Sequence, residues 1–134
     1  MTTDTRLHPD DTLRRDVVPR RLVLGLLGPP VVWAVHFLAI YGVVALTCWA
    51  GLSRWTLLGL AGQAAVVLAA TLVALALIGW AGWTAYGAWS AARADEEAPG
   101  WQAYAGRAGA LLSGLFALAV VLETVPAFVL PTCG

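Results

Sequence analysis

Two long stretches without a charged side chain constrain the fold of this chain more than any other feature of its sequence. Residues 22–53 and 55–92 contain no Asp, Glu, Lys or Arg. About 20 consecutive apolar residues suffice for an α-helix to cross the hydrocarbon core of a bilayer, and both stretches are longer. Only 12% of the residues are charged, whereas a soluble domain has about a quarter, so we expect a membrane protein.

The apolar segments predict an all-α membrane protein with three transmembrane helices. The middle stretch of 38 residues would form a helix of roughly 57 Å, much longer than a hydrocarbon core of ~30 Å. We therefore expect helix two to finish its crossing near Ala81 and to extend to position 93 along the cytoplasmic interface. Helix one contains Pro29 and Pro30, which lack backbone donors, so a bend or a late helix start is expected there. The expected spans lie at about 22–47, 56–81 and 107–130.

The arginines predict the orientation of these spans, because the cytoplasmic ends of transmembrane helices are enriched in Arg and Lys. Three spans put seven arginines on the cytoplasmic side and only Arg54 outside, whereas four spans would give five against three. We therefore expect three spans in a bacterial inner (cytoplasmic) membrane, with the N-terminus in the cytoplasm and the C-terminus outside. The seven cytoplasmic arginines are Arg6, Arg14, Arg15, Arg20, Arg21, Arg93 and Arg107.

The remaining organisation follows from the same pattern. Segment 1–21 is rich in Asp, Arg and Thr and is expected to be a disordered cytoplasmic tail, followed by a single transmembrane domain at 22–134. The formal net charge is zero, so no nucleic-acid partner is expected. Tryptophans favour membrane–water interfaces, and five of them fall at the expected span ends: Trp49, Trp55, Trp80, Trp83 and Trp89.

Small residues at four-residue spacing mark one face of the third helix. These residues are Gly106, Ala110 and Gly114. Small side chains let helix backbones approach closely, and close approach favours association between helices in lipid. This face is expected to pack either against the chain's own second helix or against a larger membrane complex.

Four polar residues lie at membrane depth: His36, Gln63, Thr71 and Glu123. A charged carboxylate that faces lipid costs at least ~2.5–3.5 kcal/mol, so Glu123 should face inward or be protonated. Antiparallel helices place His36 and Glu123 about five residues apart in depth, and we expect the two side chains to contact each other. Such a contact would hold the bundle together, or it would relay protons or bind a substrate. Alternatively, His36 would be a haem or metal ligand.

The predicted topology brings Cys48 and Cys133 to the same outer face of the membrane. Paired thiols in an oxidising compartment usually form disulfides, so a structural Cys48–Cys133 bond is the leading interpretation. Free thiols and a thiolate pair that handles copper or exchanges disulfides are the alternatives. No nucleotide-binding loop, HExxH sequence or paired-carboxylate arrangement is present, so no catalytic residue, metal site or cofactor is predicted and we do not expect an enzyme.

The first span carries a pattern that resembles a known group of proteins. Residues 28–37 read GPPVVWAVHF, and the segment continues through Tyr41 to Cys48. Together with the closing sequence LPTC at 130–133, this resembles small uncharacterised bacterial multi-span membrane proteins with a GPxxWxxHFxxxY motif and outer-face cysteines, although this chain has one more residue between Pro29 and Trp33. Such proteins tend to accompany cytochrome oxidase components. The positions that the resemblance carries over are Trp33, His36, Cys48 and Cys133.

These features lead us to expect a non-enzymatic accessory or assembly subunit of a membrane respiratory complex, specifically a haem-copper cytochrome oxidase. Its partners would be the lipid bilayer and the larger subunits of that complex. Two other classes stay open. One is a small oligomeric transporter or metal- and proton-handling protein that uses His36 and Glu123, and the other is a membrane thiol–disulfide protein.

Overall fold

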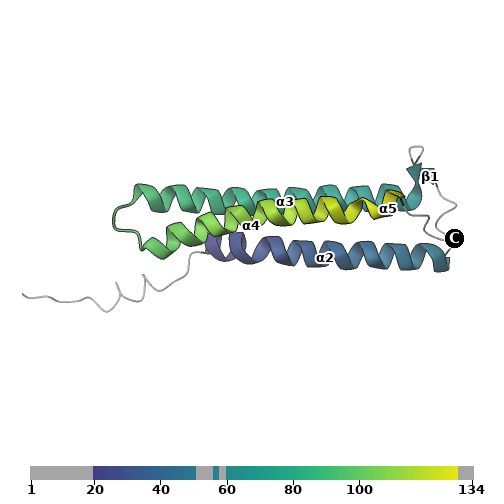
Figure 1. The fold of residues 1–134 in the computed structure, drawn as a ribbon, viewed down its shortest axis with the longest axis horizontal. Helices are drawn as coiled ribbons and strands as arrows, with labels where there is room; N and C mark the ends of the chain where they lie inside the picture. Colours follow the sequence, from purple (N-terminus) through teal and green to yellow (C-terminus); the bar gives the residue numbers. More distant parts are fainter. Residues whose placement is uncertain (1–19, 51–55, 58–59, 130–134) are drawn as a thin grey trace, which may run out of the picture.

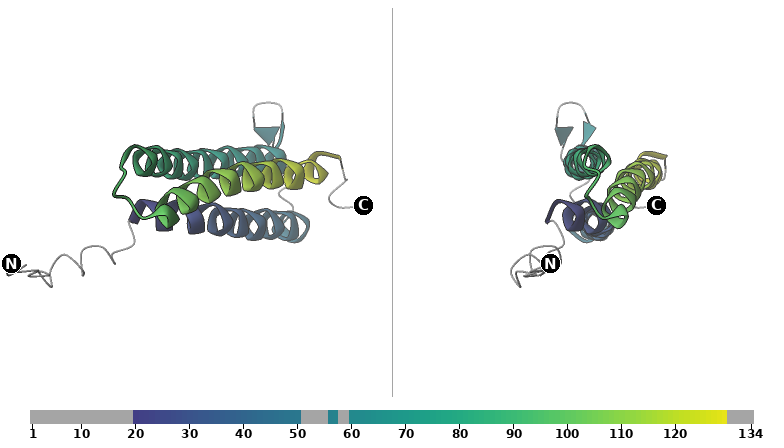
Figure 2. Two further views of the ribbon diagram at one scale, coloured as in Figure 1. Left: turned by 60° about the vertical axis from the view of Figure 1, so that its left-hand side comes forward. Right: turned by 90° about the vertical axis from the view of Figure 1, so that its left-hand side faces the viewer.

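Three long helices run side by side in the computed structural model, which describes residues 20–50, 56–57 and 60–129 (Figure 1). Each of the three is long and apolar enough to cross a membrane, which confirms the predicted all-α, three-span fold. Viewed along their length, the three helices form a triangle (Figure 2, right). The elements are α2 (Arg20–Ala50), β1 (Thr56–Leu57), β2 (Leu60–Ala61), α3 (Gly62–Ala94), α4 (Gly100–Thr124) and α5 (Pro126–Val129).

Helix α2 begins at Arg20 and passes through Pro29 and Pro30 without interruption, so the expected late start is wrong. A proline inside a membrane helix is tolerated where neighbouring helices satisfy the backbone groups that it frees. Pro29 is fully buried, and its missing N–H leaves the Gly25 carbonyl without its usual helical donor. That carbonyl faces Gly109 of α4, where a weak Cα–H···O contact is available.

The other two long helices differ from the expected spans at their first turns. Helix α3 begins at Gly62 instead of near Thr56, because residues 56–57 pair with residues 60–61 as a short antiparallel hairpin. Helix α4 begins at Gly100 instead of near position 107. Pro99 has φ −59° and ψ 131°, outside the helical region, and its carbonyl accepts the Gln102 N–H at 2.9 Å, so the helix starts directly after the turn.

All three helices approach closely at the arginine end of the bundle, which we define as the end that holds Arg21 and Arg93. An ideal Cβ on Gly25 of α2 would lie 2.7 Å from the Ala85 Cβ of α3. One on Gly109 of α4 would lie 3.0 Å from the Gly25 oxygen and 3.1 Å from the Ala85 Cβ. Small residues on each helix therefore permit this meeting point.

An apolar core follows toward the middle of the bundle. Ala74, Ile78 and Val120 are almost completely buried there. Trp33 of α2 covers this core, and its ring centroid lies 5.7 Å from that of Phe116 on α4. The aromatic pair closes the space between α2 and α4 on the arginine side of the buried polar groups described below.

Exposed aromatic side chains gather along the second half of α3. Trp80 and Trp83 are largely exposed, and the Arg93 guanidinium lies 5.4 Å from the Trp89 ring centroid. Trp49 at the end of α2 is 88% exposed, and Trp55 lies outside the described residues. An arginine stacked on an interfacial tryptophan suits the predicted cytoplasmic extension of this helix.

Candidate functional site

A cluster of polar side chains joins all three helices at the level where α4 ends. His36 of α2 is 3% exposed, and its Nε2 lies 3.1 Å from the Oγ1 of Thr71 on α3. The Thr71 Oγ1 lies 3.0 Å from the Oγ1 of Thr124, the last residue of α4. We call His36, Thr71, Thr124 and Glu123 the polar cluster.

Glu123 approaches the other nitrogen of the same ring. Its Oε2 lies 3.8 Å from His36 Nδ1, and the two side chains are 18% and 2% exposed. This distance is too long for a hydrogen bond. Among the described residues, neither carboxylate oxygen nor Nδ1 has a hydrogen-bond partner, although all three atoms are buried. The structure therefore brings together the two ionisable groups that the depth argument paired.

Each threonine hydroxyl also bonds back to its own helix. The Thr71 hydroxyl donates to the Val67 carbonyl at 2.8 Å, and the Thr124 hydroxyl donates to the Val120 carbonyl at 2.7 Å. Such bonds to the carbonyl four residues earlier let a threonine lie in an apolar helix without an unpaired hydroxyl. They also fix both side chains so that their oxygens point into the cluster.

The cluster lies where α4 stops. Pro126 has no N–H to donate to the Leu122 carbonyl, so the hydrogen-bonded helix ends at Thr124 and only the short α5 follows. The negative end of the α4 dipole therefore lies beside Glu123. Broken helices at membrane depth occur where the backbone is buried in protein or lines a cavity.

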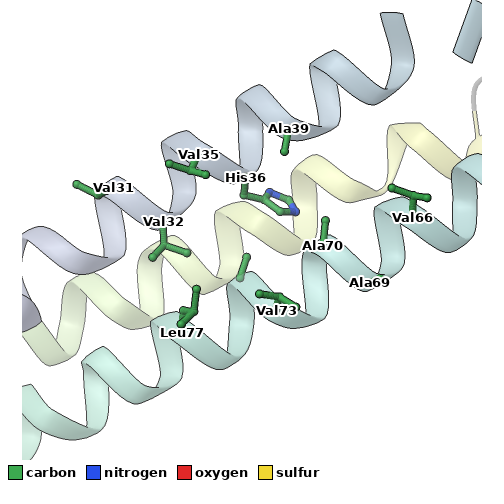
Figure 3. Close-up of a pocket in the computed structure, with 11 residues that line it drawn as sticks. Val31, Val32, Val35, His36, Ala39, Val66, Ala69, Ala70, Val73 and Leu77 are labelled. Carbon is green, nitrogen blue, oxygen red and sulfur yellow. The ribbon is translucent and has the colours of Figure 1, made fainter. Parts of the chain in front are cut away.

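One side of His36 borders an apolar groove between α2 and α3 of about 640 Å³. Figure 3 shows the His36 ring at this groove, with Ala39 and Val35 from α2 and Val66, Ala70 and Val73 from α3 around it. All the other lining residues are Val, Ala or Leu. His36 is thus the one polar side chain that the described lining offers to an occupant.

Gln63 stands apart from the cluster. It is buried at 5% exposure, and its Nε2 has no partner among the described residues. It precedes Thr71 by eight residues, which places it about 12 Å further along α3. The structure therefore separates Gln63 from the other three polar residues predicted at membrane depth.

Sequence reasoning missed Thr124, which completes the three-helix contact. A threonine in an apolar helix carries little signal because it satisfies its own hydroxyl. Its place beside Glu123, before Pro126, was the one available clue. The buried Ser113 likewise bonds to its own helix, since its hydroxyl donates to the Gly109 carbonyl at 2.9 Å.

The small residues predicted to form one face of helix three differ in their surroundings, because one packs against α3 and another has no neighbour. A Cβ on Gly106 would lie 2.8 Å from the Trp89 backbone nitrogen of α3, whereas one on Gly114 would have no neighbour within 4 Å. Ala110 is half-buried. The contact of α4 with the other helices instead runs along Gly106, Gly109 and Ser113. These residues are three and four positions apart, which is the spacing of neighbours on one face of a helix.

The predicted disulfide cannot be placed, because Cys133 lies outside the described residues and the Cys48 side chain is likewise not described. Within residues 20–50 and 60–129, no three His, Cys, Asp or Glu side chains are close enough together to hold a metal ion.

The fold and the cluster define a small three-span membrane protein with ionisable groups inside its bundle. Comparison with protein-family models, curated proteins and solved structures found no match to this chain.

Proposed function

We propose that this chain is a non-enzymatic accessory or assembly subunit that docks against a transmembrane helix of a larger respiratory subunit. The resemblance of the segment from Gly28 to Cys48 to proteins that accompany cytochrome oxidase components points to a haem-copper oxidase. The docking surface is the groove between α2 and α3, and this groove is the observation on which the proposal depends.

The groove has the chemistry that favours a helix as its occupant. Helices associate in lipid through close packing, because lipid tails already provide an apolar surrounding. The groove is lined by Ala39, Ala69, Ala70 and Ala74, which allow a neighbouring backbone to approach. Valines form its rims, and their stiff side chains lose little rotamer freedom when a partner packs against them.

The dimensions of the groove also suit a helix. Its lining on α3 extends from Val66 to Leu77, which is about 16 Å along the axis, or three helical turns. A partner ridge of Leu or Ile side chains would fill the volume that the alanines leave open.

Photo-crosslinking in native membranes tests this docking surface. Val73 lies on the groove rim and is 60% exposed, so it is the position chosen for the photoreactive residue. Leu122 on α4 is 61% exposed and does not line the groove, so it is the control position. The Thr71–Thr124 contact puts these two positions at about the same depth. Crosslinks from position 73 to one larger polypeptide, without the same product from position 122, support the proposal. Lipid adducts alone, or equal products from both positions, contradict it.

Co-purification identifies the partner class. The Ala70→Phe substitution fills the groove, whereas Ala76→Phe places the same ring on an exposed position of α3 that does not line it. Affinity purification in gentle detergent should recover haem absorbance with the wild type and with Ala76→Phe, and should lose it with Ala70→Phe. Equal haem recovery from both variants would contradict docking through the groove.

A further inference from the structure

A second cavity lies at the arginine end of the bundle, and we call it the arginine-end cavity. It has a volume of about 240 Å³ and is bounded by the start of α2, the last two turns of α3, the turn that follows and the first turn of α4. Three polar side chains line it: Arg21, Asp95 and Gln102. It shares no lining residue with the groove between α2 and α3, so the two are separate sites.

Most of the remaining lining is small, and this leaves the space open. Gly87, Ala88, Ala91 and Ala92 carry at most a methyl group, and Leu22, which is 2% exposed, provides an apolar base. A cavity of this volume holds several groups the size of a water molecule. It therefore has room for a compact polar group of a few heavy atoms.

The two charged side chains of the lining have opposite signs and do not pair with each other. Within residues 20–50 and 60–129, no ion pair joins Arg21 to Asp95. The Asp95 carboxylate is held at the turn, because its Oδ1 accepts the Glu97 N–H at 3.0 Å. An occupant with a single charge would be attracted by one of these groups and repelled by the other, whereas an occupant with one charge of each sign is attracted by both.

The helix ends beside the cavity act in the same sense. Asp95 directly follows Ala94, the last residue of α3, where the negative end of the helix dipole favours a cation. Gln102 lies in the first turn of α4, where the positive end favours an anion. The cavity is thus complementary to a dipolar occupant whose positive group lies at Asp95.

The chemistry of the lining specifies the two groups of this occupant. A guanidinium such as that of Arg21 presents a fork of N–H donors that fits a phosphate, and the Gln102 amide offers further donors. A carboxylate accepts hydrogen bonds from a primary ammonium. Quaternary ammonium groups are instead bound by aromatic faces, and the part of this lining that the structure describes contains no aromatic side chain.

The ends of the bundle lie at the level where lipids carry such groups. Helix α3 has 33 residues and is therefore about 50 Å long, whereas a bilayer with its headgroups is ~40–45 Å thick. The helix therefore reaches the headgroups on both sides, whichever way the chain is inserted. Arg93, which stacks on Trp89 at the same end, suits an interfacial position.

We infer that the arginine-end cavity binds a phosphoethanolamine group, with the phosphate on Arg21 and Gln102 and the ammonium on Asp95. The group belongs either to phosphatidylethanolamine of the surrounding bilayer or to a soluble phosphoethanolamine ester. The inference does not depend on docking at the groove, because the two sites have no residue in common.

Native mass spectrometry of the purified full chain tests the inference. The chain is offered equal amounts of phosphatidylethanolamine, phosphatidylcholine and phosphatidylglycerol with identical acyl chains. The wild type should retain one phosphatidylethanolamine in preference, and Arg21→Gln should retain about tenfold less of it. Arg93→Gln is the matched control, because Arg93 lies at the same end but does not line the cavity. Equal retention of the three lipids by the wild type, or equal losses in the two variants, would overturn the inference.

A second variant changes the preference instead of abolishing binding. Asp95→Asn removes the partner of the ammonium and leaves Arg21 as the charged group of the lining, so the ratio of retained phosphatidylglycerol to phosphatidylethanolamine should rise about tenfold. Glu96→Gln, at an exposed position outside the lining, should keep the wild-type ratio. A ratio that stays unchanged in Asp95→Asn would overturn the inference, and this includes a uniform loss of all three lipids through misfolding.

Competition identifies the source of the group. A large excess of soluble phosphoethanolamine is added to the wild type with its bound lipid. Retention of phosphatidylethanolamine assigns the cavity to the lipid headgroup, and its replacement by one soluble molecule assigns the cavity to the free ester. Both results support the proposed chemistry, whereas displacement of the lipid to the same extent by inorganic phosphate would contradict a role for the ammonium.

Discussion

Replacement of Gly106 by alanine should separate α3 from α4 near the arginine end. The added Cβ would lie 2.8 Å from the Trp89 nitrogen and 2.9 Å from both its Cα and its Cβ. Favourable contacts between heavy atoms lie at about 3.5–4.0 Å, so the two backbones must move apart by about 1 Å. The obstructing atoms are mostly backbone, and a change of side-chain rotamer cannot relieve the clash.

The expected cost is that of an overpacked interface. Such insertions cost about 1–3 kcal/mol, and a gap of 0.5–1 Å already loses a quarter to a half of each neighbouring contact. We expect Gly106→Ala to destabilise the bundle by about 2 kcal/mol, or about 30-fold in the folding equilibrium. Gly114→Ala adds the same methyl group where nothing lies within 4 Å, and it should be neutral or slightly stabilising.

The assay is reversible unfolding in mixed micelles, with both variants compared with the wild type. Because both glycines lie on α4 and undergo the same chemical change, differences in helix propensity cancel to first order. Equal stability of Gly106→Ala and Gly114→Ala would refute the reasoning, since it would mean that α3 and α4 do not approach as described.

Three further predictions concern other parts of the fold. Gly109→Ala should destabilise the same micellar bundle by about 1–3 kcal/mol, because its Cβ would lie 3.0 Å from the Gly25 carbonyl oxygen. Ile78→Ala, at a position only 1% exposed, should cost about 1–3 kcal/mol through lost packing, whereas Leu111→Ala, which is 67% exposed, should change stability little. A phosphatase fused after Gly134 should be active outside the cytoplasm and a fluorescent protein at the same position should be dark, whereas fluorescence without phosphatase activity would contradict the predicted orientation.

Much of the fold could be predicted because the bilayer imposes strong constraints on composition. Residues 22–53 and 55–92 are long and apolar enough to predict membrane helices, and the structure has such helices over most of both stretches, at Arg20–Ala50 and Gly62–Ala94. The depth match of His36 with Glu123 followed from helix rise alone. Helix limits were less predictable, because Pro99 starts α4 directly after its turn and the 56–61 hairpin delays α3, and neither effect depends on hydropathy.

The contacts within the bundle could not be predicted from spacing alone. Gly25 and Ala85 meet because α2 crosses α3 at that level. The spacing of residues within one helix does not show where that helix crosses another. Thr124 completes the polar cluster for a similar reason, since only the rotation of α4 about its axis aims its hydroxyl at Thr71. The rule of four-residue spacing included Gly114, which the structure leaves without a neighbour, because four-residue steps drift around a helix.

The central claim is that the bundle encloses His36 beside Glu123, and thiol crosslinking in native membranes tests it most directly. Cysteines would replace His36 and Glu123 in a background where Cys48 and Cys133 are serine, and a short bifunctional thiol reagent would join them. The control pairs position 36 with position 122, whose leucine is 61% exposed on α4. The account predicts an intramolecular product for the 36–123 pair and little for the 36–122 pair. Absence of the first product, or equal yields from the two pairs, would contradict it.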